Sequence, residues 1–136
     1  MKRIIIVMIL LLIPVFSFAE NVKDANKLQT LQKNKRFEIL SQHNMSGRGF
    51  RLVVLVSPST SKDQAMALAK ELRDLYKDLN PKKILDISIF DSKEAYKHQS
   101  DDKYPQKKFM KHYLVQVNVN PNTGFNEIRW VAEGRK

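Results

Sequence analysis

The segment that decides the fold is RLVVLVSPSTSKDQAMALAKELRDLYKDLNPKKILDISIF, which runs from Arg51 to Phe90. It begins and ends with apolar runs of strand length. Between them, apolar residues recur at spacings of three and four over residues 62–79, which predicts a helix with one apolar face. Asn80 and Pro81 end this helix, because proline disfavours helical geometry in the residue before it. The order strand, helix, strand predicts two parallel strands joined by a right-handed crossover.

The loop SPSTS, residues 57–61, lies between a strand and a helix N-terminus, where many phosphate sites are built. A phosphate cradle needs glycines for close backbone approach, and this loop has none. Asp63 also follows Lys62 where a P-loop has Ser or Thr, and its carboxylate repels a phosphate. Ser61 with Gln64 three residues later predicts a capping box instead. We therefore interpret the loop as a structural hinge.

Apolar and polar residues alternate in three further segments, which predicts strands. They are RFEILSQHNM (residues 36–45), HYLVQVNV (residues 112–119) and FNEIRWV (residues 125–131). The turn formers of SGRG (residues 46–49) and NPNTG (residues 120–124) predict a hairpin at each end of the domain. In HYLVQVNV, the alternation places Tyr113 on the same face as the three valines.

The segment DSKEAYKH, residues 91–98, predicts a short second helix, with Asp91 as N-cap and Glu94 three residues later. One amphipathic helix cannot cover both faces of a five-stranded sheet. The sequence therefore predicts an α+β fold. We expect a two-layer sandwich in which a mixed sheet of four to five strands carries the main helix on one face and is partly open on the other.

The first 19 residues, MKRIIIVMILLLIPVFSFA, have the composition of a secretory signal peptide. Lys2 and Arg3 precede a short apolar run, and Ser17 and Ala19 provide a small-x-small exit. We expect cleavage after Ala19, with retention as a membrane anchor as the alternative. We expect residues 20–35 to be a flexible leader that allows a frayed helical turn, and residues 36–136 to form a single domain. The composition and the style of the signal are typical of a bacterial protein, so we expect a periplasmic or secreted location.

Removal of the signal leaves 22 basic and 14 acidic residues, a formal charge of +8. This basic balance favours anionic partners. The chain has no cysteine, which excludes a disulfide framework, a cysteine nucleophile and a thiolate metal site. It also has no G-x-S-x-G motif. No catalytic residue, metal ligand or cofactor is therefore predicted, and a binding protein is favoured over an enzyme.

The stretch KYPQKKFMKHY, residues 103–113, interleaves lysines with aromatic residues in what the sequence predicts to be a basic loop leading into a strand. The candidate binding residues are Lys107, Lys108, Lys111 and Tyr113, because cations bind anionic groups and aromatic rings stack on bases or sugars. A solvated surface loop is the alternative interpretation. Trp130, on the last strand, is a further candidate for a protein-binding patch if the sheet has an open face, or else a packing residue.

A metal or acid–base site is the remaining possibility. His98, Asp101, Asp102 and His112 are residue types that ligate zinc and related ions, although their spacing fits no known ligand motif. The alternative function is therefore a small metal-dependent or hydrolytic envelope enzyme that uses Asp101, Asp102 and His112.

The pieces RLVVLV, TSKDQAMALAKEL, ISIFDS and HYLVQVNVNPNTGFNEIRWV together resemble a family of small exported bacterial α+β domains of unknown function. These pieces cover most of residues 50–131 and are mainly determinants of the fold. The resemblance implies an α+β domain and carries over no catalytic residue. The leading functional hypothesis is an exported, non-enzymatic domain that binds a protein or an anionic envelope component. Nucleic acid is not an expected partner, nor is stable membrane insertion after signal cleavage.

Overall fold

A computed structural model of the protein describes residues 22–134. The predicted signal peptide and its cleavage site therefore lie outside the described residues. The described part of the chain divides into two units between residues 34 and 35, and each unit is described by itself.

Helix α2 (Val22–Lys35) occupies the segment that the sequence predicts to be a flexible leader with at most one frayed turn. That prediction is wrong over these residues, which form a helix of 14 residues. The segment contains neither proline nor glycine, and it is rich in lysine, glutamine and leucine, which are good helix formers. The helix propensity of these residues thus accounts for a helix in a segment with little apolar periodicity.

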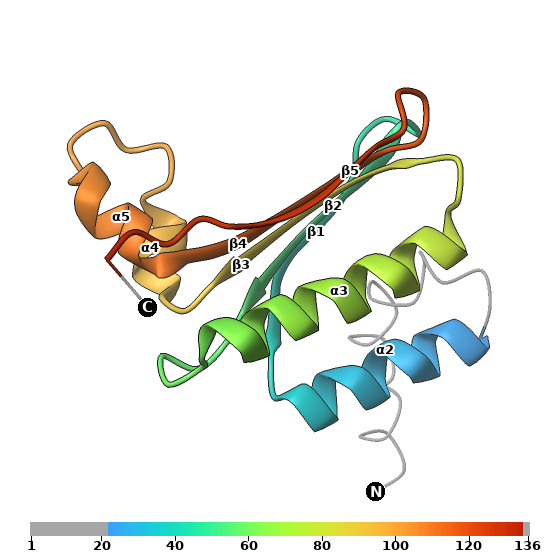
Figure 1. Ribbon diagram of the computed structural model, residues 1–136, viewed down its shortest axis with the longest axis horizontal. Helices are drawn as coiled ribbons and strands as arrows, with labels where there is room; N and C mark the ends of the chain where they lie inside the picture. The colour runs from blue at the N-terminus through green and yellow to red at the C-terminus, as the bar shows by residue number, and fades with distance from the viewer. Residues whose placement is uncertain (1–21, 135–136) are drawn as a thin grey trace, which may run out of the picture. The chain divides into compact units, whose positions relative to one another are not determined.

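The second unit is the predicted α+β domain (Figure 1). Its five strands lie in the sheet in the order of the chain: β1 (Glu38–Asn44), β2 (Gly49–Leu55), β3 (Ile84–Phe90), β4 (Tyr113–Asn120) and β5 (Phe125–Trp130). Strands β2 and β3 are parallel, and every other neighbouring pair is antiparallel. Helix α3 (Lys62–Leu79) connects the two parallel strands and packs on β3, β4 and β5. The predicted mixed sheet and its covering helix are confirmed.

The main core lies between α3 and one face of the sheet. Leu52, Ile87 and Val117 are aligned across the three central strands, and all three are fully buried. The helix contributes Ala65, Leu68, Ala69, Leu72 and Tyr76. At its N-terminus, Ser61 and Gln64 form the predicted capping box, in which each side chain accepts a hydrogen bond from the other residue's backbone N–H. Ser61, at the end of the loop, is therefore the residue that starts the helix, as predicted.

Among the described residues of this unit, two short helices cover one end of the other face of the sheet (Figure 1). Helix α4 (Lys93–Lys97) is the predicted short helix, and α5 (Gln106–His112) forms where the sequence predicts a loop. Phe90, Val53 and Ala95 are buried there, and five half-buried apolar or aromatic side chains pack on them: Leu40, Leu55, Tyr96, Phe109 and Tyr113. This second cluster gives α5 the tertiary packing that a helix of seven residues needs.

Two details at this end of the sheet differ from the sequence predictions. The N-cap of α4 is Ser92, whose hydroxyl accepts from the Ala95 N–H, and not Asp91. In addition, the register between β3 and β4 shifts at Phe90, so that Tyr113 lies opposite Phe90. Tyr113 is therefore not on the face of the valines, because the register shift reverses the alternation of side chains at this point. The Tyr113 ring stacks on the Phe90 ring, with 4.8 Å between the centroids.

We expect Tyr76→Phe to stabilise the domain. The Tyr76 hydroxyl is buried and has no hydrogen-bond partner in the structure. Removal of an unsatisfied buried hydroxyl should raise the free energy of unfolding by about 1 kcal/mol. Tyr113→Phe is the matched control, because it removes a hydroxyl that lies 3.2 Å from the Ser88 hydroxyl. Urea unfolding of both variants measures the difference, and a loss of stability in Tyr76→Phe would contradict the prediction.

The same residue predicts a decline in stability at alkaline pH. Burial raises the pKa of Tyr76 from 10.0 to about 12 in the folded domain, so the unfolded chain loses this proton first. Below pH 10 Tyr76 is protonated in both states, and its ionisation does not lower the free energy of unfolding. As the pH rises from 10 toward 12, Tyr76 ionises in the unfolded chain first, and the free energy of unfolding falls. Burial also raises the pKa of Tyr113. We therefore expect Tyr76→Phe to flatten part, and not all, of the decline in unfolding free energy across this range.

Candidate functional site

The candidate lysines lie on the α4–α5 region, defined as residues 93–112. Helix α5 carries Lys107, Lys108 and Lys111, all of them exposed, and no residue of this helix is buried. Lys93 and Lys97 on α4 and Lys103 in the connecting loop are exposed as well. The region contains six lysines against three acidic residues, so its own charge balance is basic. The predicted binding lysines are thus presented by a helix instead of a loop.

Lys108 makes contacts within the region, whereas Lys107 and Lys111 make no ion pair with a described residue. The Lys108 Nζ lies 3.3 Å from Glu94 Oε1 and 5.1 Å from the centre of the Tyr104 ring. The hydrogen bond from Lys108 to the Glu94 carboxylate raises the pKa of this lysine. Lys107 and Lys111 make no ion pair with any residue that the structure describes. These two ammonium groups remain free to meet an anionic partner.

The connecting loop is ordered by its own polar contacts. The Asp101 carboxylate accepts a hydrogen bond from the Lys103 N–H at 3.0 Å and lies 3.1 Å from His98 Nδ1. These contacts, that of Lys103 first, lower the pKa of Asp101. The His98 ring in turn stacks on Tyr104 at 4.8 Å between centroids. The loop is therefore a folded connection that fixes where α5 begins.

His112 has a different acidic partner from the one that the sequence indicates. Its Nδ1 lies 2.8 Å from Oδ1 of Asp91, and its carbonyl oxygen accepts a hydrogen bond from the Asp91 N–H at 3.1 Å. The Asp91 side chain is 2% exposed and that of His112 is 35% exposed. A buried carboxylate at Nδ1 fixes the orientation of an imidazole and leaves Nε2 as its reactive nitrogen. The sequence does not indicate Asp91 as this partner, because a capping role already accounts for the residue. The available signal is its place directly after β3, at the carboxyl end of a parallel strand.

The predicted acid–base cluster is not assembled. His98 pairs with Asp101, whereas His112 pairs with Asp91, and the exposed Asp102 takes part in neither contact. Across residues 22–134, no group of three or more His, Asp or Glu side chains is placed to hold a metal ion.

The two aromatic candidates do not join the lysines on one surface. Tyr113 is half-buried beneath α5, with its ring 5.8 Å from that of Phe109, so it supports the helix. Trp130 shares a face of the sheet with Asn126 and Ile128, as predicted, and this is the face that α3 covers. The Lys62 Nζ lies 5.7 Å from its ring. Trp130 is therefore not part of the open face.

The open face itself is polar. Arg51 pairs with Asp86 at 3.1 Å, and Arg129 donates to Gln116 at 2.8 Å. These pairs join side chains of neighbouring strands. The described side chains of these two pairs make this part of the open face polar, and the predicted patch around Trp130 does not lie on it.

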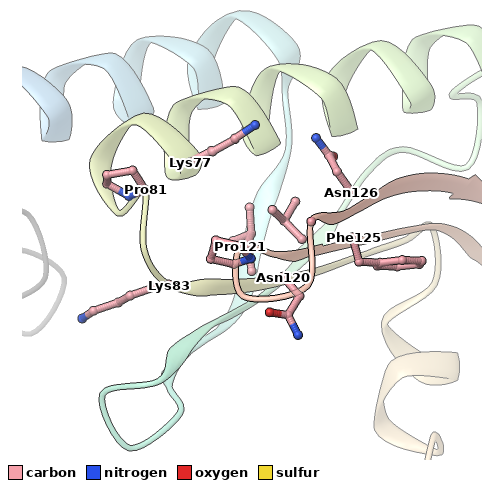
Figure 2. A pocket seen from close by; sticks show the side chains of 10 residues that line it. Lys77, Pro81, Lys83, Asn120, Pro121, Phe125 and Asn126 are labelled. Atoms are coloured by element: carbon pink, nitrogen blue, oxygen red, sulfur yellow. The ribbon is translucent and has the colours of Figure 1, made fainter.

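Two hollows lie elsewhere on the domain. One, of about 120 Å³, lies between the end of α3 and the turn before β5 (Figure 2). It is lined mainly by apolar atoms, and Lys77 and Lys83 are at its border. The other, of about 480 Å³, lies at the carboxyl ends of β2 and β3 and includes Ser57, Asp91 and Lys93. Neither hollow contains a residue of the predicted binding set.

We expect the Asp91–His112 contact to stabilise the packing of α5 on the end of β3. His112→Ala removes one partner of a buried carboxylate, which should lower the free energy of unfolding by roughly 1–3 kcal/mol. His98→Ala is the matched control, because it breaks a histidine–aspartate contact in which both side chains are more than 40% exposed. We expect this control to leave stability nearly unchanged in thermal unfolding. Equal losses in the two variants would contradict a special role for the buried pair.

No protein-family model matches the sequence, and no curated protein or solved structure matches it. The resemblance to small exported domains stays an expectation. Any function must be argued from the geometry of this chain.

Proposed function

We propose that this protein is an exported, non-enzymatic binding domain that attaches to an anionic component of the cell envelope through the lysines of the α4–α5 region. The observation that carries the proposal is the placement of Lys107 and Lys111 on an exposed helix, where neither has an ionic partner among the described residues. Export is supported by the composition of residues 1–19.

The surroundings of the two lysines favour electrostatic attachment over a deep ligand site. Phe109 of α5 and Tyr113 of β4 both pack on Phe90, and these contacts fix α5 on the sheet. The ammonium groups are thereby carried on a fixed support, and less conformational freedom is lost when they meet a partner. Neither of the two hollows described above includes Lys107 or Lys111. The exposed position of these lysines on a helix favours a surface or polymer with repeated negative charges as the partner.

We expect electrostatic attachment to an anionic surface. No helix within residues 22–134 is long and apolar enough to cross a bilayer. A cluster of lysines binds anionic headgroups or polymers with an affinity that falls as salt is added, because the charges are screened within about 8 Å at physiological ionic strength. Salt dependence is thus the signature of this mode of binding.

The test uses the expected mature chain, from Glu20 onward, and vesicles with or without phosphatidylglycerol. We expect binding to the anionic vesicles at low salt, none to neutral vesicles, and loss of binding as salt rises. The double variant Lys107→Glu/Lys111→Glu should weaken the binding by more than about tenfold, since each attracting charge becomes a repelling one. Vesicle sedimentation measures each affinity.

The control variant is Lys70→Glu/Lys77→Glu, which changes the net charge equally through two exposed residues of α3. We expect it to weaken binding much less, because these lysines lie outside the α4–α5 region. Equal weakening in both variants would leave only a non-specific effect of net charge. If the wild-type chain binds no anionic vesicle at low salt, attachment to an anionic membrane surface is excluded, and a protein partner becomes the hypothesis to pursue.

A second candidate is a hydrolytic role for the Asp91–His112 pair, in place of the predicted Asp101, Asp102 and His112. The specific observation in its favour is the 2.8 Å contact of a buried carboxylate with a partly exposed imidazole. Such an imidazole can act as a general base through Nε2. The test compares wild type with His112→Gln on chromogenic carboxylate and phosphate esters. Equal background rates in the two proteins would end this candidate.

A further inference from the structure

Strand β5 forms one edge of the sheet, and its outer side carries unused backbone hydrogen-bonding groups. Among the described residues, its only neighbouring strand is β4. The pairing with β4 runs without a register shift from Phe125 to Trp130, so the strand is regular along its whole length. At the opposite edge, β1 carries an irregularity between Ile39 and Ser41, a device that makes an edge a poor template for further pairing. The regular edge is the one suited to accept another strand.

The direction of the backbone groups follows from one hydrogen bond. The Val131 N–H donates to the Leu114 carbonyl of β4 at 2.8 Å. Because the direction alternates along an antiparallel strand, the N–H and C=O of Phe125, Glu127 and Arg129 also face β4. Those of Asn126, Ile128 and Trp130 therefore face outward. An added antiparallel strand can form about six main-chain hydrogen bonds with these three residues if its own groups have the same spacing.

A second copy of β5 has that spacing. If two copies pair antiparallel about a two-fold axis, outward-facing residues must lie opposite outward-facing residues. This requirement allows only registers in which a residue lies opposite itself. The three central choices put Glu127, Ile128 or Arg129 on the axis. The first brings two carboxylates together and the third brings two guanidinium groups together, and both arrangements repel.

The register centred on Ile128 is selected by charge. It places Glu127 opposite Arg129 of the second copy, and the reverse, at the closely spaced positions between the backbone hydrogen bonds. Both side chains lie on the open face of the sheet, in the rows of Asn118 and Gln116. Glu127 makes no ion pair with any described residue of its own chain. Two cross-strand ion pairs thus form without breaking an existing one.

This register also covers the most exposed apolar side chain of the domain. Phe125 is 50% exposed and is the only large hydrophobic side chain in the exposed class among the described residues. With Ile128 on the axis, Phe125 lies opposite Val131 of the second copy, at both ends of the paired strands. We propose that two copies of this chain dimerise through β5 in this register and form one continuous sheet of ten strands.

The test is a charge exchange measured by sedimentation equilibrium. Glu127→Arg alone and Arg129→Glu alone each place like charges opposite one another, and we expect each to raise the dimer dissociation constant by on the order of tenfold or more. The double exchange Glu127→Arg/Arg129→Glu restores both pairs with reversed polarity, and we expect it to restore dimerisation. Asp78→Arg on α3 is the control with an equal change of charge, and it should leave the dimer intact.

A crosslinking experiment tests the register independently, because the chain has no cysteine of its own. Ile128→Cys should form an intermolecular disulfide on mild oxidation, since residues on the axis have Cα atoms about 5.5 Å apart. Asn126→Cys should not, because its two copies lie about 13 Å apart along the strands. A wild-type chain that stays monomeric up to about 1 mM would overturn the proposal. So would a double exchange that fails to recover, or crosslinking at residue 126 instead of 128.

Discussion

The domain depends on the cover that α3 provides for the parallel pair β2 and β3. Two parallel strands cannot be joined by a tight turn, so the chain must cross over the sheet, and the crossover is the helix that buries the sheet's apolar face. Leu52 on β2 and Ile87 on β3 lie opposite each other in this pair, and both are fully buried. Gly49 begins the same pair, and a side chain there would collide with the Ile84 carbonyl. The outer strands then add to this centre as antiparallel hairpins.

The opposite face of the sheet is apolar at one end, around Phe90, and this end needs a cover of its own. Phe90 is the last residue of β3 and is almost fully buried, although it lies on the side away from α3. Rings from α4, α5 and β4 surround it, with centroids 4.8 to 5.8 Å away. Helices α4 and α5 bury this apolar end of the face. Their outward side is left for lysines, so the surface that we propose to bind an anionic partner follows from the way the second cluster is covered.

Much of this architecture could be predicted from the sequence, because long periodic segments carry strong signals. The stripe of α3, its capping box and the five strands all follow from spacing and turn chemistry. The sequence did not predict the helices α2 and α5, which have little apolar periodicity, or the local details of register and capping that no periodic pattern encodes. The register shift beside Phe90 reverses the side on which Tyr113 lies, and Ser92 takes the capping role that Asp91 also fits. The sequence therefore groups His112 with Asp101 and Asp102, whereas its partner in the structure is Asp91.

The irregularity between Ile39 and Ser41 has a consequence for how far assembly can proceed. A sheet with two equivalent open edges can grow without limit, because each added copy presents a fresh edge. In this domain the two edges differ, since only β5 is regular throughout. Association through β5 uses the same strand in both copies and so consumes the only regular edge that each one has. In the dimer that we propose, a closed pair is then the end point, and the difference between the two edges prevents growth into fibres.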